Sequence, residues 1–398
     1  MELDSFQVLQ RGPDGLAHLL GHAEPLKACV PYAFGEAVEV FVGDVFILAG
    51  QSNMEGVGNL VDVEEPSPFV RNFQSCELWD LAEEPLFWLN ESPRSVHRAI
   101  WGMPPLSGDP EPRDPNRTKG AGLGLPFGKG WHERTGVPVG LVPCAHGGTS
   151  MSQWSPSLKD EGGASLYGAT VLRHEKVGGK VAAILWYQGE SDANPTDAPL
   201  YFDRMKELIA AFRRDFNQPD LPFYYVQLGR FATESTPDGD ATWSVVRESQ
   251  RLLQSAVPHT AMVSAIDLDL DDAIHISTSG LKRLGKRLVD VALGIPSPDL
   301  AGVQMEADGQ RIRVSFKNLR GGLHAASRPS GFSLRSPEGK DLARIYKTTL
   351  DGDDAILHCD PLATKGLHLW YGYGFDPYCN LTDAEDAAVP AFGPVVLE

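Results

Sequence analysis

The sequence predicts an α/β protein with a doubly wound, parallel sheet at its core. Wholly apolar runs such as residues 45–49 are typical of strands buried on both faces of a parallel sheet. These runs alternate with segments of helical periodicity, and such alternation implies parallel strands joined by crossover helices. After Pro296-Ser-Pro298 the pattern changes to short strands without a helix. We therefore expect an α/β core followed by an antiparallel β module.

The expected strands and helices follow from local patterns along the core. Strands are expected at residues 45–49, 73–79, 137–143, 181–187, 223–228 and 261–266. Helices are expected at 125–135, around 205–216, at 243–256, and from 277–279 to Val291. The first of these helices should end at Gly136, because glycine is the preferred residue after a helix end. The last should begin at the capping residues Ser277 to Ser279.

Three parts are expected along the chain. Residues 1–42 contain short apolar pieces broken by Gly and Pro, and we interpret them as a small N-terminal β element. Residues 43–298 form the α/β domain. Residues 299–398 form the C-terminal β module, in which Ile312, Val314 and Phe316 alternate with polar neighbours as in a half-buried strand.

Composition restricts the class of protein. The chain has 398 residues and a formal net charge of −18, so it has no excess of Lys and Arg to neutralise nucleic-acid phosphates or an anionic membrane surface. No run approaches the length of a membrane span. The five cysteines form no CxxC pair, which argues against a disulfide scaffold or a zinc site. We expect neither nucleic-acid nor membrane partners, and the oligomeric state is not predicted.

The N-terminus, Met-Glu-Leu-Asp-Ser, lacks the basic and apolar regions of a secretory signal. This favours a protein that stays in the cytoplasm over the mature part of an exported one, although the compartment itself stays open.

Ser52 is the candidate nucleophile. It follows the buried run 45–49 and Gly50, where a strand leaves the carboxyl edge of the sheet, and ligands bind at that edge in open α/β sheets. A serine in a sharp turn there can present its hydroxyl for attack and its own N–H as an oxyanion donor. The alternative is a strand end followed by a serine that caps a helix.

Three further predicted strand ends show the same pattern, in which an apolar run is followed by small or polar residues. The chain contains Gly147-Gly148-Thr149, Gln188-Gly-Glu190 and Asp272-Ala-Ile-His275. His275 can take the proton of Ser52, and Asp272 lies three residues before it on the same tight turn, within reach of its other nitrogen. The N–H groups of Ser52 and Gly148 and the amide of Gln188 can bind the oxyanion. Alternatively, the glycines form an ordinary turn and Gln188 caps a strand.

Two other interpretations compete with parts of this site. His146, beside the Gly-Gly pair, is a rival base, but it has no acid nearby in the sequence. The acidic turn at 267–272 resembles a calcium loop. However, EF-hand spacing requires Gly at the sixth loop position and Glu at the twelfth, where this chain has Asp272 and Thr278. We therefore predict no metal and no other cofactor.

Four segments together resemble the motifs of the SGNH-type carbohydrate acetylesterases. These are Gly50-Gln-Ser-Asn-Met54, Gly147-Gly-Thr-Ser-Met-Ser-Gln-Trp154, Trp186-Tyr-Gln-Gly-Glu-Ser-Asp192 and Asp272-x-x-His275. More narrowly, they resemble the sialate O-acetylesterase-like domain and its acetylxylan esterase relatives, over about residues 43 to 294. Val8-Leu-Gln-Arg11 and Asn380-Leu-Thr are also similar to the sialate esterase branch.

The resemblance implies a flavodoxin-like three-layer α/β/α core and a catalytic triad of Ser52, His275 and Asp272. It also implies that the substrate is an acetylated carbohydrate. His275 is followed by Ile276-Ser-Thr, in the style of the acetylxylan esterases rather than the His-Pro of sialate esterases. The sequence therefore leaves both kinds of sugar open.

Three residues are candidates for substrate binding. Trp154 can stack on a sugar ring or simply fill the core, since large aromatic residues do both. Glu190 and Gln51 can bind sugar hydroxyls or support the site. The overall prediction is a serine esterase that deacetylates a carbohydrate. The alternatives are a carbohydrate-binding protein on an inactive esterase scaffold and a lipid or thioester hydrolase.

Overall fold

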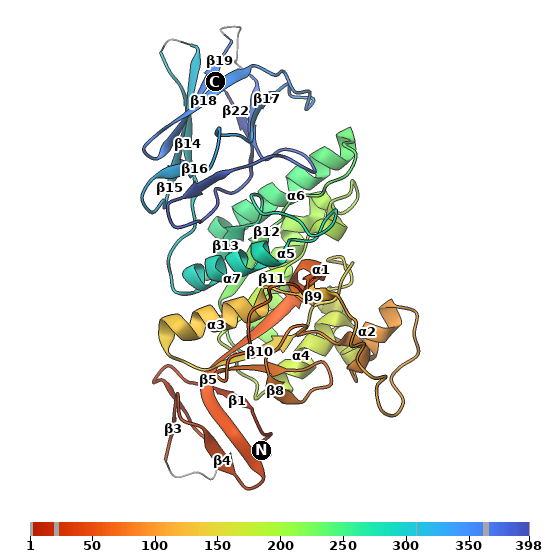
Figure 1. The fold of residues 1–398 in the computed structure, drawn as a ribbon. Coiled ribbons are helices and arrows are strands. Elements are labelled where there is room, and N and C mark those ends of the chain that lie inside the picture. The colour runs from red at the N-terminus through yellow and green to blue at the C-terminus, as the bar shows by residue number, and fades with distance from the viewer. Residues whose placement is uncertain (1–2, 20–23, 308, 361–365, 398) are drawn as a thin grey trace. The chain divides into compact units, whose positions relative to one another are not determined.

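The computed structural model describes residues 3–19, 24–307, 309–360 and 366–397 (Figure 1). Residues 1–2 and 20–23 of the predicted N-terminal element lie outside these ranges, as do residues 308, 361–365 and 398 of the predicted C-terminal module. The chain divides into two compact units. The first comprises Met1–Gln188, Asp203–Tyr224 and His275–Val289; the second comprises Gly189–Phe202, Tyr225–Ile274 and Asp290–Glu398.

A mostly parallel sheet forms the centre of the first unit. Its strands are ordered β11 (Ala183–Tyr187), β5 (Ala37–Gly50), β10 (Val139–Pro143), β7 (Val70–Phe73) and β8 (Trp79–Leu81). Strands β11 and β10 both run parallel to β5, and β10 runs parallel to β7. Only β8, at the edge of this series, is antiparallel to its neighbour. The predicted parallel core is confirmed.

Strand β5 is longer than predicted because it joins the expected central strand to the apolar piece before it. It has 14 residues, and Figure 1 shows it as one long arrow. Its first half pairs with β1 (Val8–Gln10) and β4 (Tyr32–Phe34), beside the short pair β2 (Leu16–Ala17) and β3 (Leu26–Lys27). Leu9, Leu26 and Val40 belong to a small core of their own there. The N-terminal β element is therefore built on the first half of the central strand.

Helices cover both faces of this sheet. Leu141 is in register with Phe46 on one side and Asn72 on the other, so these three side chains share a face. On that face Phe46 contacts Phe127 of α3 (Gly124–Thr135), with ring centroids 4.8 Å apart. Phe73 points to the opposite face, where the guanidinium of Arg173 from α4 (Leu166–Lys176) lies 4.7 Å from its ring. The result is the expected three-layer α/β/α arrangement.

The remaining elements of the first unit surround this sheet. They are α1 (Ser52–Glu55), β6 (Gly58–Asn59), η1 (Leu89–Glu91), α2 (Ser95–Ile100), β9 (Lys119–Ala121), η2 (Pro156–Ala164), and most of α5 (Tyr201–Asp215) and of α7 (Thr278–Ala292). Tyr167 of α4 stacks on Phe212 of α5, with ring centroids 4.8 Å apart. Helix α7 packs closely on α3, because a side chain at Gly285 would meet Pro126 and Phe127. Helix α3 ends as predicted, with Gly136 in the left-handed region at φ 70°.

The predicted strand at residues 73–79 is wrong. This segment is the turn of an antiparallel hairpin, in which Phe73 of β7 pairs with Trp79 of β8. Gln74 and Glu77 close the turn through a backbone hydrogen bond, and Glu77 adopts a left-handed conformation at φ 66°. No Gly or Asn marks the turn, so the reversal of the chain at this point could not be recognised from the residues.

The second unit combines two strands and a helix of the predicted core with the C-terminal module. The core elements in this unit are β12 (Phe223–Gln227), α6 (Pro237–Ala256) and β13 (Thr260–Ser264), together with η3 (Glu190–Asp192) and η4 (Ala198–Leu200). The boundary between the units falls within β12, so only its last three residues belong to the second unit. The module contains β14 (Asp299–Met305), β15 (Arg311–Lys317), β16 (Leu323–Ala325), β17 (Phe332–Arg335), β18 (Ile345–Asp351), β19 (Asp354–Cys359), β20 (His368–Tyr371), β21 (Leu381–Asp383) and β22 (Phe392–Val396). Its sheets are ordered β14-β15-β19-β18, β17-β20-β22 and β16-β21, and all their pairings are antiparallel, as predicted.

Buried polar side chains tie the C-terminal module to residues 225–274. The side-chain amide of Gln227 donates to Ala391 O at 2.8 Å and accepts the Ala391 N–H at 2.8 Å. The guanidinium of Arg247, fully buried in α6, donates to Gly372 O at 3.1 Å and to Gly374 O at 2.5 Å. These bonds explain why the compact units do not follow the predicted boundaries at residues 42 and 298. The three-part division stays a prediction.

Two general features concern the described residues as a whole. All five cysteines lie among them, and each is a free thiol. None of the described helices combines the length and the apolar character that a membrane span requires.

Gly50 permits the close approach of β5 and β11. It has φ 134°, and a Cβ at this position would lie 2.1 Å from Tyr187 O. We expect Gly50→Ala to lower the free energy of unfolding much more than Gly136→Ala, where φ is 70° and no heavy atom lies within 4 Å of an added Cβ. The control should lose about 1–2 kcal/mol from backbone strain, and Gly50→Ala about 2 kcal/mol or more beyond that. Urea denaturation measures both, and equal losses would contradict the role of the contact.

Candidate active site

The turn that carries Ser52 begins where β5 ends. Gly50 is in register with Tyr187, the last residue of β11, and the Gln51 N–H donates to Tyr187 O at 2.8 Å. Ser52 is then the first residue of the single-turn helix α1, and its side chain is partly exposed. The predicted nucleophile therefore lies at the carboxyl edge of the parallel sheet, directly after its central strand.

The Gly147-Gly148 turn lies beside Ser52. The chain leaves β10 alongside β5, because the Cys144 N–H donates to Leu48 O at 2.7 Å and the His146 N–H donates to Gly50 O at 3.1 Å. A Cβ added to Gly147 would lie 3.4 Å from the Ser52 Cβ. The sheet thus brings together two strand ends that are almost 100 residues apart in the sequence.

Two of the predicted oxyanion donors are backbone N–H groups. Gly148 has φ 69°, a conformation that favours glycine, and an added Cβ would meet no heavy atom within 4 Å. Within the described part of the chain, no hydrogen bond uses the N–H of Ser52 or of Gly148. The same holds for Ser52 Oγ, so its contact with His275 stays a prediction.

Gln188, the third predicted donor, follows the end of β11 and is fully buried. Its Nε2 donates to Thr149 O at 3.0 Å, which ties it to the residue after Gly148. An amide nitrogen carries two hydrogens, and the predicted oxyanion role requires the second. The structure therefore places Gln188 beside the Gly147-Gly148 turn, and its oxyanion role stays a prediction.

The segment that contains His275 is tied to the Ser52 turn. The N–H of Ile276 donates to Asn53 Oδ1 at 3.0 Å, so the residue after the predicted base contacts the residue after the predicted nucleophile. Asp272 is exposed, and its Oδ1 accepts the Ile274 N–H at 3.0 Å. The boundary between the two compact units falls between Ile274 and His275. The pairing of Asp272 with His275 accordingly stays a prediction.

Glu55 is a site residue that the sequence reasoning missed. Its Oε2 accepts the Gly147 N–H at 2.7 Å, which joins the last residue of α1 to the glycine turn. Burial raises the pKa of Glu55 to about 7, although this hydrogen bond and the charge of Arg117 act in the opposite direction. The available signal was an acidic residue three positions after Ser52, one helical turn away, because such residues share a helix face.

A second buried carboxyl group lies near Arg117. Burial raises the pKa of Glu84 to about 8, against hydrogen bonds from the Gly122 and Leu86 N–H groups and the charge of Arg117. Arg117 itself is partly desolvated, which lowers its pKa. The charge of one guanidinium thus acts on both carboxyl groups and does not offset their burial. We therefore expect Glu55 and Glu84 to bind protons near neutral pH.

His146, the rival base, is engaged elsewhere. It is buried, its Nδ1 lies 3.1 Å from His97 Nδ1, and the two rings stack. Burial lowers the pKa of His146 to about 4. A base that holds its proton this weakly is poorly matched to proton transfer at neutral pH. The structure therefore favours His275 over His146.

The predicted substrate-binding residues differ in their exposure. Trp154 is fully buried, its Nε1 donates to Thr149 Oγ1 at 3.1 Å, and its ring meets Trp186 edge-on. It offers no free face to a sugar, so this structure favours the packing role that the sequence left open. Gln51 is also buried, whereas Glu190 in η3 is partly exposed. Their contacts with substrate stay predictions.

The acidic turn at 267–272 gives no sign of a cation site. Among the described residues, no group of three or more His, Cys, Asp or Glu side chains is arranged to hold a metal ion.

Comparisons with known proteins identify the family of this chain. The model of the family "Carbohydrate esterase, sialic acid-specific acetylesterase" matches residues 42–294. The chain is 33% identical over 260 residues to a probable carbohydrate esterase of Arabidopsis thaliana, covering 63% of this chain and 90% of that protein. The chain belongs to this family of carbohydrate esterases. It is therefore a member of the carboxylic ester hydrolases.

More distant relatives extend the comparison. Sialate O-acetylesterase of Mus musculus is 24% identical over 288 residues, and the match spans 58% of this chain and about half (52%) of the mouse protein. The crystal structure of a carbohydrate acetylesterase from Xanthomonas citri has a TM-score of 0.70 at 22% identity and covers 98% of this chain and 97% of its own. That likeness extends over the whole chain and confirms the predicted fold, an SGNH-type α/β core with additional antiparallel sheets.

The raised pKa of Glu55 predicts how the free energy of unfolding depends on pH. An acid whose pKa rises from 4.5 in the free chain to about 7 in the fold binds a proton more tightly when folded, so ionisation destabilises the fold as pH rises through this interval. Glu55→Gln cannot ionise. Relative to the wild type, its free energy of unfolding should increase by about 1–3 kcal/mol between pH 5 and pH 8.

Denaturant titrations at several pH values measure this difference. The control is Glu133→Gln, which alters an exposed acid on α3. Parallel pH dependences in the Glu55→Gln variant and the wild type would show that Glu55 ionises as it does in the unfolded chain.

Proposed function

We propose that this chain is a serine esterase that removes O-acetyl groups from a carbohydrate, either a sialic acid or a xylan-type sugar, through an acetyl-enzyme intermediate. The observation that carries the proposal is the meeting of Ser52, the Gly147-Gly148 turn and Gln188 at the ends of three adjacent parallel strands. Membership of a carbohydrate acetylesterase family supports the same chemistry.

In the first half of the reaction Ser52 attacks the acetyl ester. Its Oγ forms a bond to the carbonyl carbon while His275 takes the hydroxyl proton. The tetrahedral intermediate then collapses, the bond to the sugar oxygen breaks, and His275 returns the proton to that oxygen. The products of this half are the free sugar hydroxyl and Ser52 carrying an acetyl group.

In the second half water releases the acetyl group. His275 takes a proton from water as the water oxygen attacks the acetyl carbon, and it returns the proton to Ser52 Oγ when acetic acid leaves, which then ionises to acetate in solution. Asp272 would hold the imidazole in the required tautomer and stabilise its positive charge. The net reaction consumes one ester and one water and needs no cofactor.

Negative charge on the tetrahedral oxygen requires fixed donors. The N–H groups of Ser52 and Gly148 and the second hydrogen of the Gln188 amide would supply them, each typically worth about 3 kcal/mol. Glu55 would act as a positioning residue, because its carboxylate holds the Gly147 N–H and thereby the turn that presents Gly148. The donors would then be in place before the reaction begins.

Two other functions fit the fold less well. A carbohydrate-binding protein on an inactive scaffold would have no need for the serine, histidine and acid that this chain retains. A lipid or thioester hydrolase would need a long apolar channel for its acyl chain. The loop between residues 104 and 117, rich in Pro and charged residues, is a poor lining for one.

The nucleophile is tested by Ser52→Ala. We expect this variant to lose hydrolysis of p-nitrophenyl acetate by at least about a thousandfold, with an unchanged thermal unfolding midpoint, since Ser52 Oγ has no partner among the described residues. Ser107→Ala, in an exposed loop, is the matched control and should behave as the wild type. Full turnover by Ser52→Ala would refute the mechanism.

The oxyanion role of Gln188 makes a separate prediction. Gln188→Ala should lower kcat by about a hundredfold and leave KM nearly unchanged, because the amide would bind the charge that develops only in the transition state. Steady-state kinetics on p-nitrophenyl acetate measures both constants, and circular dichroism checks the fold. A rise in KM alone would instead indicate that Gln188 binds the ground-state substrate.

A further inference from the structure

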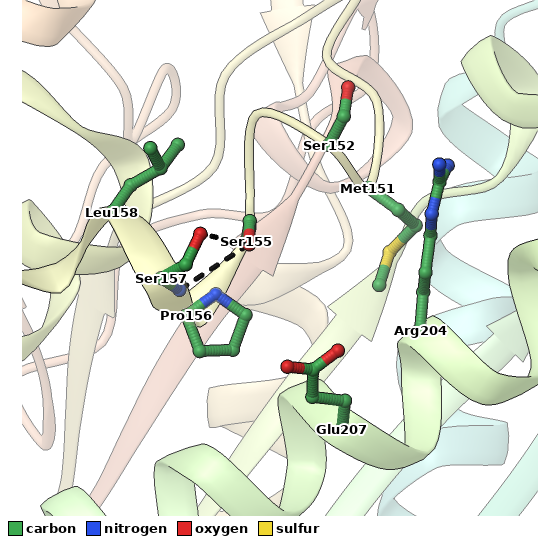
Figure 2. Close-up of a pocket in the computed structure, with 8 residues that line it drawn as sticks. All are labelled: Met151, Ser152, Ser155, Pro156, Ser157, Leu158, Arg204 and Glu207. Atoms are coloured by element: carbon green, nitrogen blue, oxygen red, sulfur yellow. Dashed lines mark hydrogen bonds between the residues drawn. The ribbon is translucent and has the colours of Figure 1, made fainter.

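The residues shortly after the Gly147-Gly148 turn line a pocket. This pocket has no role in the proposed esterase mechanism. Its volume is about 290 Å³, and it is open to solvent on one side. Residues of the segment 151–158 and Arg204 and Glu207 of α5 line it (Figure 2). Arg204 and Glu207 are three residues apart and therefore lie on one face of the helix. The volume lies just below the usual range for small-molecule sites, about 300–1,000 Å³, and suits a single sugar unit.

The charges of the pocket select the kind of ligand. A guanidinium only donates hydrogen bonds and a carboxylate only accepts them. An anion bound here would face the carboxylate of Glu207, and a cation would face the guanidinium of Arg204. A hydroxyl group both donates and accepts, so a neutral ligand with several hydroxyl groups can form hydrogen bonds with both side chains. The opposed charges thus favour a neutral polyol over a charged ligand.

The opposite wall has the mixed character that a sugar ring requires. Ser155 and Ser157 are hydrogen-bonded through their hydroxyl groups at 2.8 Å, and hydroxyls of this kind can exchange partners with a ligand. Met151 and Pro156 provide apolar surface for the C–H groups of a ring. In Figure 2 the Arg204 side chain extends beside Met151, on the α5 side of the pocket.

The pocket lining begins a few residues after the Gly147-Gly148 turn, which lies beside Ser52. Met151 is four residues after Gly147, so their Cα atoms are at most about 15 Å apart, and a Cβ on Gly147 would lie 3.4 Å from the Ser52 Cβ. The turns between residues 147 and 154 shorten this distance. A short oligosaccharide with its acetyl group at Ser52 can span such a distance.

We propose that this pocket is a subsite for a neutral sugar unit of the substrate, a few units from the acetylated one. The proposal rests on the proposed function, and it assigns specificity for an oligosaccharide rather than for a free monosaccharide. Arg204 and Glu207 bind hydroxyl groups of that unit, while the wall formed by Ser155, Pro156 and Ser157 contacts its other face.

The test compares two substrates in matched variants. We expect Arg204→Ala and Glu207→Ala each to lower, about tenfold, the ratio of kcat/KM for O-acetylated oligosaccharides to kcat/KM for p-nitrophenyl acetate, mainly through KM. The controls are Lys206→Ala and Asp203→Ala, which remove an exposed charge of each sign from the same helix and lie outside the pocket lining. The controls should keep the wild-type ratio, and an equal ratio in all four variants would overturn the subsite.

A binding measurement separates this proposal from the proposed function. In the Ser52→Ala background, neutral xylo-, manno- and galacto-oligosaccharides without acetyl groups are titrated by calorimetry. Binding that weakens about tenfold in Ser52→Ala/Glu207→Ala supports the subsite even if the wild type hydrolyses no ester. Hydrolysis of p-nitrophenyl acetate without binding of any neutral oligosaccharide would be consistent with the esterase function but would refute the subsite. Tighter binding of oligogalacturonate than of the neutral chains would overturn its selectivity.

Discussion

The carbonyl group of Tyr187 determines where the turn that carries Ser52 begins. It accepts the Gln51 N–H at 2.8 Å, and it occupies the space that a side chain at residue 50 would need. Glycine is therefore required at the end of β5, and the chain turns out of the sheet directly afterwards. The residue directly after β11 is Gln188, so the same contact fixes the Ser52 turn and the predicted amide donor relative to each other.

Patterns within a few residues were enough to predict most of the core. The buried strands around Ile47, Leu141 and Ile184 are apolar because both faces of a parallel sheet are covered, and such runs are easy to recognise. Helix α4 was missed for a related reason. It buries polar side chains such as Arg173 and His174 together with apolar ones, so it shows no amphipathic stripe. The hairpin after Phe73 was missed because its turn lacks the usual residues.

The site was predictable only where its residues mark strand ends. Ser52 and Gln188 stand out because polar residues follow apolar runs, and this rule brings them to one sheet edge. The supporting contacts are not local: Glu55 reaches Gly147 across 92 residues. Asn53 reaches the segment before α7 across 223. No rule of sequence spacing connects residues so far apart. These contacts can be seen only in the folded structure, where the sheet brings the segments together.

The Ser52 turn is held by its neighbours rather than by Ser52 itself. Gln51 bonds to β11 through its N–H, Asn53 to the segment before α7, and Glu55 to the Gly147 turn. Among the described residues, the N–H and hydroxyl of Ser52 have no such bond. In the proposed mechanism Ser52 attacks the substrate and its N–H binds the oxyanion, and a structural hydrogen bond at the same groups would add to the barrier because it would have to break first. Bonds from the neighbours of Ser52, rather than from Ser52 itself, are therefore the arrangement that the proposed acyl transfer would require.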